Sequence, residues 1–121
     1  MAEQHESLII AFRKRILKKG FREGKSPMPT FRPDVFAERI STNGRIIEQI
    51  AVEAEIASSL FSEHTTGQLV KLSEFIEHQK GKGIPVRGYL LVPGGKRLLA
   101  QANSLLFTLP ASVPIRVVQL P

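Results

Sequence analysis

The spacing of apolar positions along the chain predicts three helices and four strands. Three stretches have apolar residues every three or four positions, which is typical of amphipathic helices. Two other stretches are short, apolar and rich in β-branched residues, which is typical of strands. The helices are expected over residues 3–19, 65–80 and 96–106, and these two strands over residues 86–92 and 115–120. Thr65-Thr66-Gly67-Gln68 has the capping-box pattern and marks the expected start of the second helix.

The other two strands are predicted to form a β-hairpin around Asn43-Gly44. An Asn-Gly pair is a strong hairpin signal because a type I′ turn needs positive φ at both central residues. Strand-like sequence flanks the pair, over residues 31–40 and 45–57. With a two-residue loop, paired residue numbers sum to a constant, and the count places Asp34 directly opposite Glu53.

This pairing brings two carboxylates together on one face of the sheet. Directly opposed side chains have Cβ atoms about 5 Å apart, and like charges at that spacing are destabilising. A divalent cation is the usual compensation for such a pair. The same count places Arg32 opposite Glu55, where an ion pair is expected.

The order of these elements predicts an α/β fold with a mixed sheet. The expected order is α-β-β-α-β-α-β, with helices on the faces of the sheet, in a single domain over residues 1–121. Cysteine is absent, which excludes disulfides and thiolate metal sites. The chain starts without the basic segment of a signal peptide, and no apolar stretch approaches the roughly 20 residues of a membrane span. We therefore expect a soluble cytoplasmic protein that does not enter the membrane.

The charge of the chain is unevenly distributed. The formal net charge is +6, but residues 26–80 carry eight acidic residues against five Lys and Arg, whereas residues 81–121 carry five Lys and Arg and no acid. An acidic centre in a basic protein suits a metal-dependent enzyme that acts on a polyanion. The basic cluster of the first helix comprises Arg13, Lys14, Arg15, Lys18, Lys19 and Arg22. It is equally explained by a solvated helix face and by contact with the DNA backbone.

A second basic segment follows Gly94-Gly95, at Lys96 and Arg97. A strand-to-helix turn is the plain interpretation of the two glycines, but the amides at a helix start can also meet a phosphate. The three histidines His5, His64 and His78 lack metal-ligand spacing and are interpreted as surface residues.

Two short segments resemble the motifs of the PD-(D/E)XK nuclease superfamily. They are Arg32-Pro33-Asp34-Val35 and, about twenty residues later, Val52-Glu53-Ala54-Glu55. The superfamily includes restriction endonucleases and Holliday-junction resolvases, and places a proline–aspartate motif on one hairpin strand and a (D/E)-x-K motif on the next. The resemblance implies a restriction-endonuclease-like core of the order α-β-β-β-α-β.

The resemblance also implies a metal-dependent nuclease. Asp34 and Glu53 match the two acids that hold Mg²⁺ or Mn²⁺, and the carbonyl of Ala54 matches a further ligand. Glu6 on the first helix matches an acid of some resolvase-like members, and Gln68 a glutamine of some exonuclease-like members. The expected activity is hydrolysis of DNA phosphodiester bonds.

One residue departs from the family pattern. Glu55 stands where the superfamily has its lysine, and a carboxylate cannot neutralise developing negative charge. Three explanations compete: Lys71 takes over from the second helix, Glu55 acts as a metal ligand or general base, or the site has lost its chemistry.

Three functions therefore stay open. The first is a nuclease that contacts the DNA backbone with little sequence preference and acts as a homodimer or with partners. The second is a catalytically inactive module of the same fold that binds nucleic acid or a partner protein. The third is an α/β domain unrelated to nucleic acid, with Asp34 and Glu53 solvated on an open sheet face.

Overall fold

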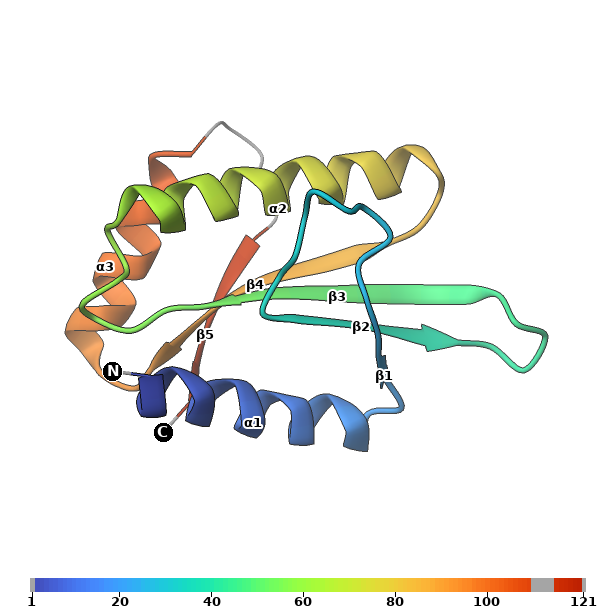
Figure 1. The fold of residues 1–121 in the computed structure, drawn as a ribbon, viewed down its shortest axis with the longest axis horizontal. Coiled ribbons are helices and arrows are strands. Elements are labelled where there is room, and N and C mark those ends of the chain that lie inside the picture. Colours follow the sequence, from blue (N-terminus) through green and yellow to red (C-terminus); the bar gives the residue numbers. More distant parts are fainter. Residues whose placement is uncertain (1, 110–114, 121) are drawn as a thin grey trace.

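The computed structural model of the protein describes residues 2–109 and 115–120. These residues form three helices and five strands, shown in Figure 1. In chain order the elements are α1 (Ala2–Lys18), β1 (Arg22–Glu23), β2 (Val35–Ile40), β3 (Ile46–Ala54), α2 (Glu63–Gly81), β4 (Val86–Pro93), α3 (Lys96–Phe107) and β5 (Ile115–Leu120). The predicted α/β order is confirmed, with the short strand β1 as an addition. No helix of these described residues is long and apolar enough to cross a bilayer.

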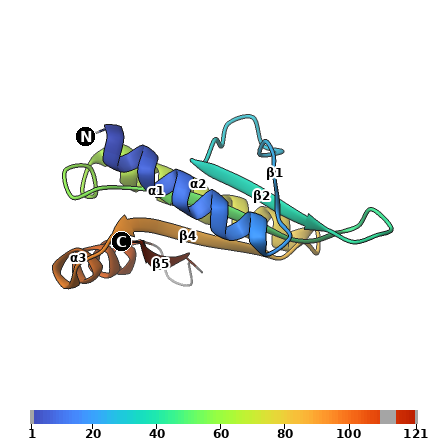
Figure 2. The same cartoon turned by 90° about the horizontal axis from the view of Figure 1, so that it is seen from below.

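The strands form one mixed sheet with helices on both faces. The strand order is β1-β2-β3-β4-β5, in which the first two pairs are antiparallel and the last two are parallel. Helix α1 packs on one face, and α2 and α3 pack on the other (Figure 2). Parallel neighbours need a crossover, and α2 and α3 provide the crossovers from β3 to β4 and from β4 to β5.

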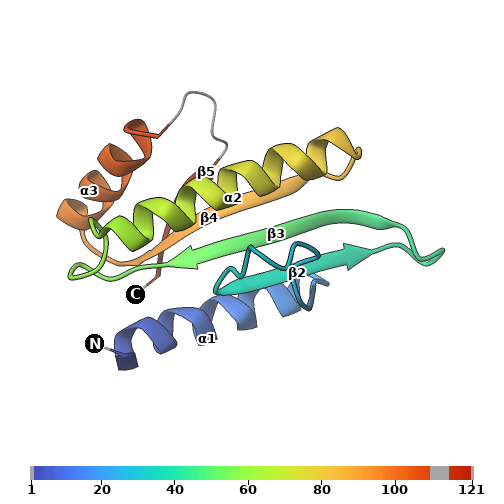
Figure 3. The same ribbon diagram turned by 45° about the horizontal axis from the view of Figure 1, so that its top comes forward.

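The hairpin turn differs from its prediction. The loop has three residues, 42–44, and not two. Ser41 and Arg45 are the paired residues that close it, because Ser41 N–H donates to the carbonyl of Arg45 at 2.8 Å. Gly44 N–H donates to the Ser41 carbonyl at 3.0 Å, and Gly44 has a φ of 84°. A three-residue loop that ends in a left-handed glycine is a common alternative to the two-residue type I′ loop. The turn projects beyond the rest of the sheet (Figure 3).

The register beyond the turn agrees with its prediction, although the route to it does not. Ile40 pairs with Ile46, one position away from the expected partner Ile47. An irregularity between Arg39 and Ile40 then shifts the register, so that Arg39 pairs with Glu48. The longer loop and the bulge cancel, and the strand bodies keep the predicted pairing through to Val35 opposite Val52.

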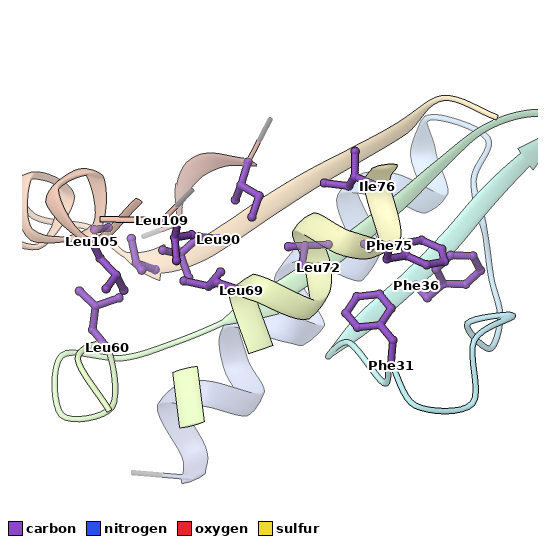
Figure 4. Close-up of a cluster of buried hydrophobic side chains, with 14 residues drawn as sticks. Phe31, Phe36, Leu60, Leu69, Leu72, Phe75, Ile76, Leu90, Leu105 and Leu109 are labelled. Carbon is purple, nitrogen blue, oxygen red and sulfur yellow. The ribbon is translucent and has the colours of Figure 1, made fainter. Parts of the chain in front are cut away.

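Two hydrophobic clusters hold the layers together. The cluster beneath α1 includes Leu8, Ile9, Phe12 and Ile16 from the helix and Val35, Ile50, Val52 and Leu91 from the strands. The cluster beneath α2 and α3 is drawn in Figure 4. There the ring of Phe75 lies 4.9 Å from that of Phe31 and 5.9 Å from that of Phe36, which fastens the loop before β2 to α2.

Helix α2 begins one turn earlier than its capping box predicts. Ser62 is the N-cap, and its Oγ accepts from Thr65 N at 3.1 Å. Thr65 is buried inside the first turn, and its hydroxyl donates to the carbonyl of Ser59 at 2.8 Å. The prediction that Thr65 caps α2 is therefore wrong, because its hydroxyl binds the carbonyl of Ser59 in the preceding loop. Gln68 consequently lies beyond the first turn of α2.

We expect Leu72→Ala to lower the free energy of unfolding by about 2–5 kcal/mol, because Leu72 is fully buried between α2 and the sheet. Urea unfolding checks this value, with Glu77→Ala on the exposed side of α2 as the control that stays within about 0.5 kcal/mol. Equal losses in both variants would contradict the assignment of this helix face.

Candidate functional site

A hollow of about 560 Å³ opens at the carboxyl end of β3. Figure 1 shows that this end of β3 lies at the same end of the molecule as the starts of α1 and α2. The hollow is lined by His5, Arg32, Asp34, Glu53, Glu55, Ile56, Ser59, His64 and Gln68. The fold thus brings together four of the candidate catalytic residues, from the segment before β2, from β3, from the loop after it and from α2.

Asp34 directly precedes β2 and is held beside the end of β3. Its Oδ2 accepts a hydrogen bond from Ala54 N at 2.8 Å. Asp34 stands one position before Val35, whose partner is Val52, so the ladder leads directly to Glu53. His5 of α1 approaches from the other side, with its Nε2 3.5 Å from Asp34 Oδ2.

Glu53 is the most perturbed acid of the site. Its side chain points toward α2 and is only 3% exposed. Burial, the nearby charges of Asp34 and Glu55 and a hydrogen bond with Asp34 together raise the pKa of Glu53 to about 9, and a hydrogen bond with Gln68 acts in the opposite direction. Within the described chain, Glu53 Oε1 is buried without a hydrogen-bond partner. Protein groups alone therefore keep this carboxyl protonated at neutral pH.

These features fit a hard divalent cation. A cation would compensate the repulsion between Asp34 and Glu53 and would give the unpartnered Oε1 a ligand role. The backbone N–H of Glu55 points toward β4, where it donates to the Leu91 carbonyl. The backbone N–H of the preceding residue, Ala54, therefore points the other way, toward β2. Because the N–H and C=O of a strand residue face the same edge, the Ala54 carbonyl faces the edge that carries Asp34.

The side-chain donors are few. In the residues that the structure describes, no group of three or more His, Asp or Glu side chains is arranged to hold a metal ion. Mg²⁺ is commonly bound by one or two carboxylates and several waters, so the pair Asp34 and Glu53 is compatible with Mg²⁺ or Mn²⁺.

Glu55 is bound by its own loop. Its Oε2 accepts from Ser59 Oγ at 2.8 Å, and Ser59 Oγ in turn accepts from Ile56 N at 3.2 Å. Arg32 lines the same hollow but forms no ion pair with Glu55. The expected ion pair is wrong because β3 ends at Ala54 and the ladder does not extend to residue 55.

Other candidate residues lie outside the hollow. Lys71 is exposed on α2 and Glu6 is exposed on α1, and neither lines the hollow. Of the predicted DNA-contacting residues, Arg13 is paired with Glu23 at 2.9 Å. The other predicted contacts are exposed. Lys14 and Lys18 lie on α1, Lys19 directly follows it, and Lys96 and Arg97 start α3. Arg22, predicted as part of the basic cluster of the first helix, instead opens β1.

Sequence reasoning missed the two histidines of the hollow. His64 is exposed, as expected, but it lines the hollow, and His5 is half-buried beside Asp34. Neither has a partner at metal-ligand spacing in the sequence. Only the packing of α1 across the sheet brings His5 to this point.

Comparison with known proteins adds one distant likeness. No family model matches the chain, and no curated protein matches its sequence. The solved structure of an EndoMS–dsDNA2 complex aligns with 98% of this chain at 18% sequence identity and a TM-score of 0.45. The chain spans 44% of the length of that protein. A likeness at this level carries no argument about activity.

We expect the stability of the metal-free protein to fall as pH rises from 4.5 to about 9, because in this range the unfolded chain releases the Glu53 proton whereas the folded protein keeps it. The contribution is complete below the ordinary pKa of 4.5, and its slope reaches up to about 1.4 kcal/mol per pH unit above it. Glu53→Gln keeps a neutral side chain and lacks this loss. Urea unfolding in EDTA should therefore show that the free energy of unfolding of the variant increases relative to that of the wild type as pH rises. An equal pH dependence of the two proteins would contradict the raised pKa of Glu53.

Proposed function

We propose that the protein is a metal-dependent nuclease that hydrolyses DNA phosphodiester bonds. The observation that carries the proposal is the pair of adjacent acids at the end of β3, in which Glu53 has a buried oxygen without a partner. Asp34, Glu53 and the carbonyl of Ala54 would hold Mg²⁺ or Mn²⁺. The cation would activate a water and stabilise negative charge on the scissile phosphate.

The chain's own residues would orient this centre. The Ala54 N–H fixes one oxygen of Asp34, which leaves the other oxygen available to a cation. Gln68 hydrogen-bonds to Glu53 and restrains its carboxyl. Arg32 is exposed at the hollow, where a guanidinium can bind a phosphate in a bidentate manner.

The basic composition supports a polyanionic substrate. The exposed cations of α1 and α3 supply contacts to phosphates that need no sequence preference. The residues that the structure describes form one sheet and three helices, a small surface for extended DNA. A homodimer, or a complex with partner proteins, is therefore proposed as the working form on extended DNA.

A second candidate function is a DNA-binding module without cleavage. It is favoured by Glu55, which replaces the lysine of the motif, and by the absence of lysine among the described residues that line the hollow. In this case Glu55 is a structural residue that fastens the loop through Ser59.

We expect the wild type to cleave DNA in Mg²⁺ or Mn²⁺, and Asp34→Asn and Glu53→Gln each to lower the rate at least about 100-fold, because each removes an anionic ligand worth several kcal/mol in the transition state. Plasmid, linear, single-stranded and branched DNA would be tested. The control is Glu74→Gln, which removes an exposed carboxylate from α2.

The outcomes separate the two candidate functions. Loss of cleavage in both site variants, with cleavage retained in the control, supports the nuclease. A wild type that binds every DNA and cleaves none would make the binding module the function.

A further comparison concerns the cation that replaces the motif lysine. We expect Arg32→Gln to lower the cleavage rate about 10- to 100-fold, the value of a hydrogen bond to a charged group, and Lys71→Gln to have a smaller effect. The reason is that Arg32 lines the hollow and Lys71 does not. A larger loss in Lys71→Gln, measured on the same substrates, would favour the lysine of α2.

A further inference from the structure

A second basic surface lies on the α1 side of the sheet. Two hollows, of about 120 Å³ and 360 Å³, share Arg87 and Tyr89 of β4 as lining residues. Arg15 of α1 and Lys19, directly after α1, line the first hollow, and Arg116 of β5 lines the second. We call this set the β4–β5 basic surface: Arg15, Lys19, Arg87, Tyr89 and Arg116.

The charge of this surface is unbalanced. No acidic residue of the described chain lines either hollow, whereas Asp34, Glu53 and Glu55 line the hollow of the carboxylate site. The acid nearest to Arg87 is Glu48, which lies 3.0 Å from it and 2.8 Å from Arg39. One carboxylate between two guanidiniums leaves a net positive charge, and Arg87 is 64% exposed.

The surface is built on rigid elements. Tyr89 pairs with Val52 on one side and with Arg116 on the other, so the surface crosses the middle of the sheet to its edge strand. The ring of Tyr89 packs against Phe12 of α1 at 5.9 Å between centroids. The position of Arg87 is restrained by its contact with Glu48, which is only 13% exposed. Because these cations stand on strands and on a packed helix, the distances between them are fixed by the fold.

The β4–β5 basic surface and the carboxylate site face opposite sides of the sheet. Tyr89 and Val118 pack against the cluster beneath α1. Glu53 is turned toward Gln68 of α2, and its register partner Leu90 belongs to the cluster beneath α2 and α3. A ligand segment bound at one surface is therefore separated from the other by the sheet.

We propose that the β4–β5 basic surface binds the phosphate backbone of a second nucleic-acid segment, distinct from the segment at the carboxylate site. Three of its four cations are arginines, whose planar guanidinium groups match phosphate geometry. The cations line hollows, which suits a narrow backbone better than a flat bilayer. The proposal rests on the proposed function only for the choice of nucleic acid as ligand, and it requires no cleavage.

The test measures binding of a short fluorescent duplex DNA by anisotropy in EDTA, over a range of NaCl concentrations. Each phosphate contact contributes about 0.9 to the slope of log affinity against log salt. The double variant Arg87→Gln/Arg116→Gln should therefore bind more weakly and lower the slope by about 1.8. The matched control is Arg45→Gln/Lys82→Gln, which removes the same charge from exposed positions in the hairpin turn and after α2.

The outcomes distinguish this proposal from the proposed function. A loss of DNA affinity in Arg87→Gln/Arg116→Gln that the control double variant lacks, with an unchanged melting temperature, supports the surface even in a protein that cleaves nothing. Equal losses in the two double variants, or no loss in either, would overturn it. Two other anionic ligands are tested in parallel, vesicles that contain phosphatidylserine and a poly-glutamate peptide. If the protein binds either of them through Arg87 and Arg116 but does not bind DNA, the proposal is also overturned.

Discussion

The antiparallel pairing of β2 with β3 is the constraint on which the candidate site depends. It sets Val35 opposite Val52 and so brings Asp34 to the end of β3, where Ala54 N–H binds its carboxylate at 2.8 Å. A slip of one residue would turn every side chain of the strand to the other face. The buried positions on both faces of β3 oppose such a slip, and the core thereby holds the two acids together.

The site is costly to the fold, which is informative about function. A buried carboxyl with an unpartnered oxygen, beside two other acids, is unfavourable for stability. Folded proteins usually pair such groups, and exceptions concentrate at functional positions. Glu55 shows the contrast within three residues, because its carboxylate is satisfied by Ser59 in its own loop. Glu53 is the acid that is left for a ligand from outside the chain.

The carboxylate site and the β4–β5 basic surface lie on different faces of the sheet. Acids gather at the carboxyl end of β3 on the α2 side, and cations gather along β4 and β5 on the α1 side. Helix α1 contributes to both, with His5 beside Asp34 near its start and Arg15 and Lys19 near its end. This separation would allow a phosphate-rich ligand to be attracted to the protein without neutralising the carboxylates.

The sequence by itself determined the element order apart from β1, the mixed sheet, and the hairpin register that brings Asp34 close to Glu53. These features follow from local periodicity and from a strand period of two. The register counted from the Asn-Gly pair is correct only because two errors cancel. The loop is one residue longer than expected, and a bulge between Arg39 and Ile40 restores the register. Tertiary structure alone decided which side chains meet from distant elements. It brought His5 to Asp34, left Lys71 outside the hollow and joined Arg15, Arg87 and Arg116, because helix packing has no signature in the spacing of charged residues.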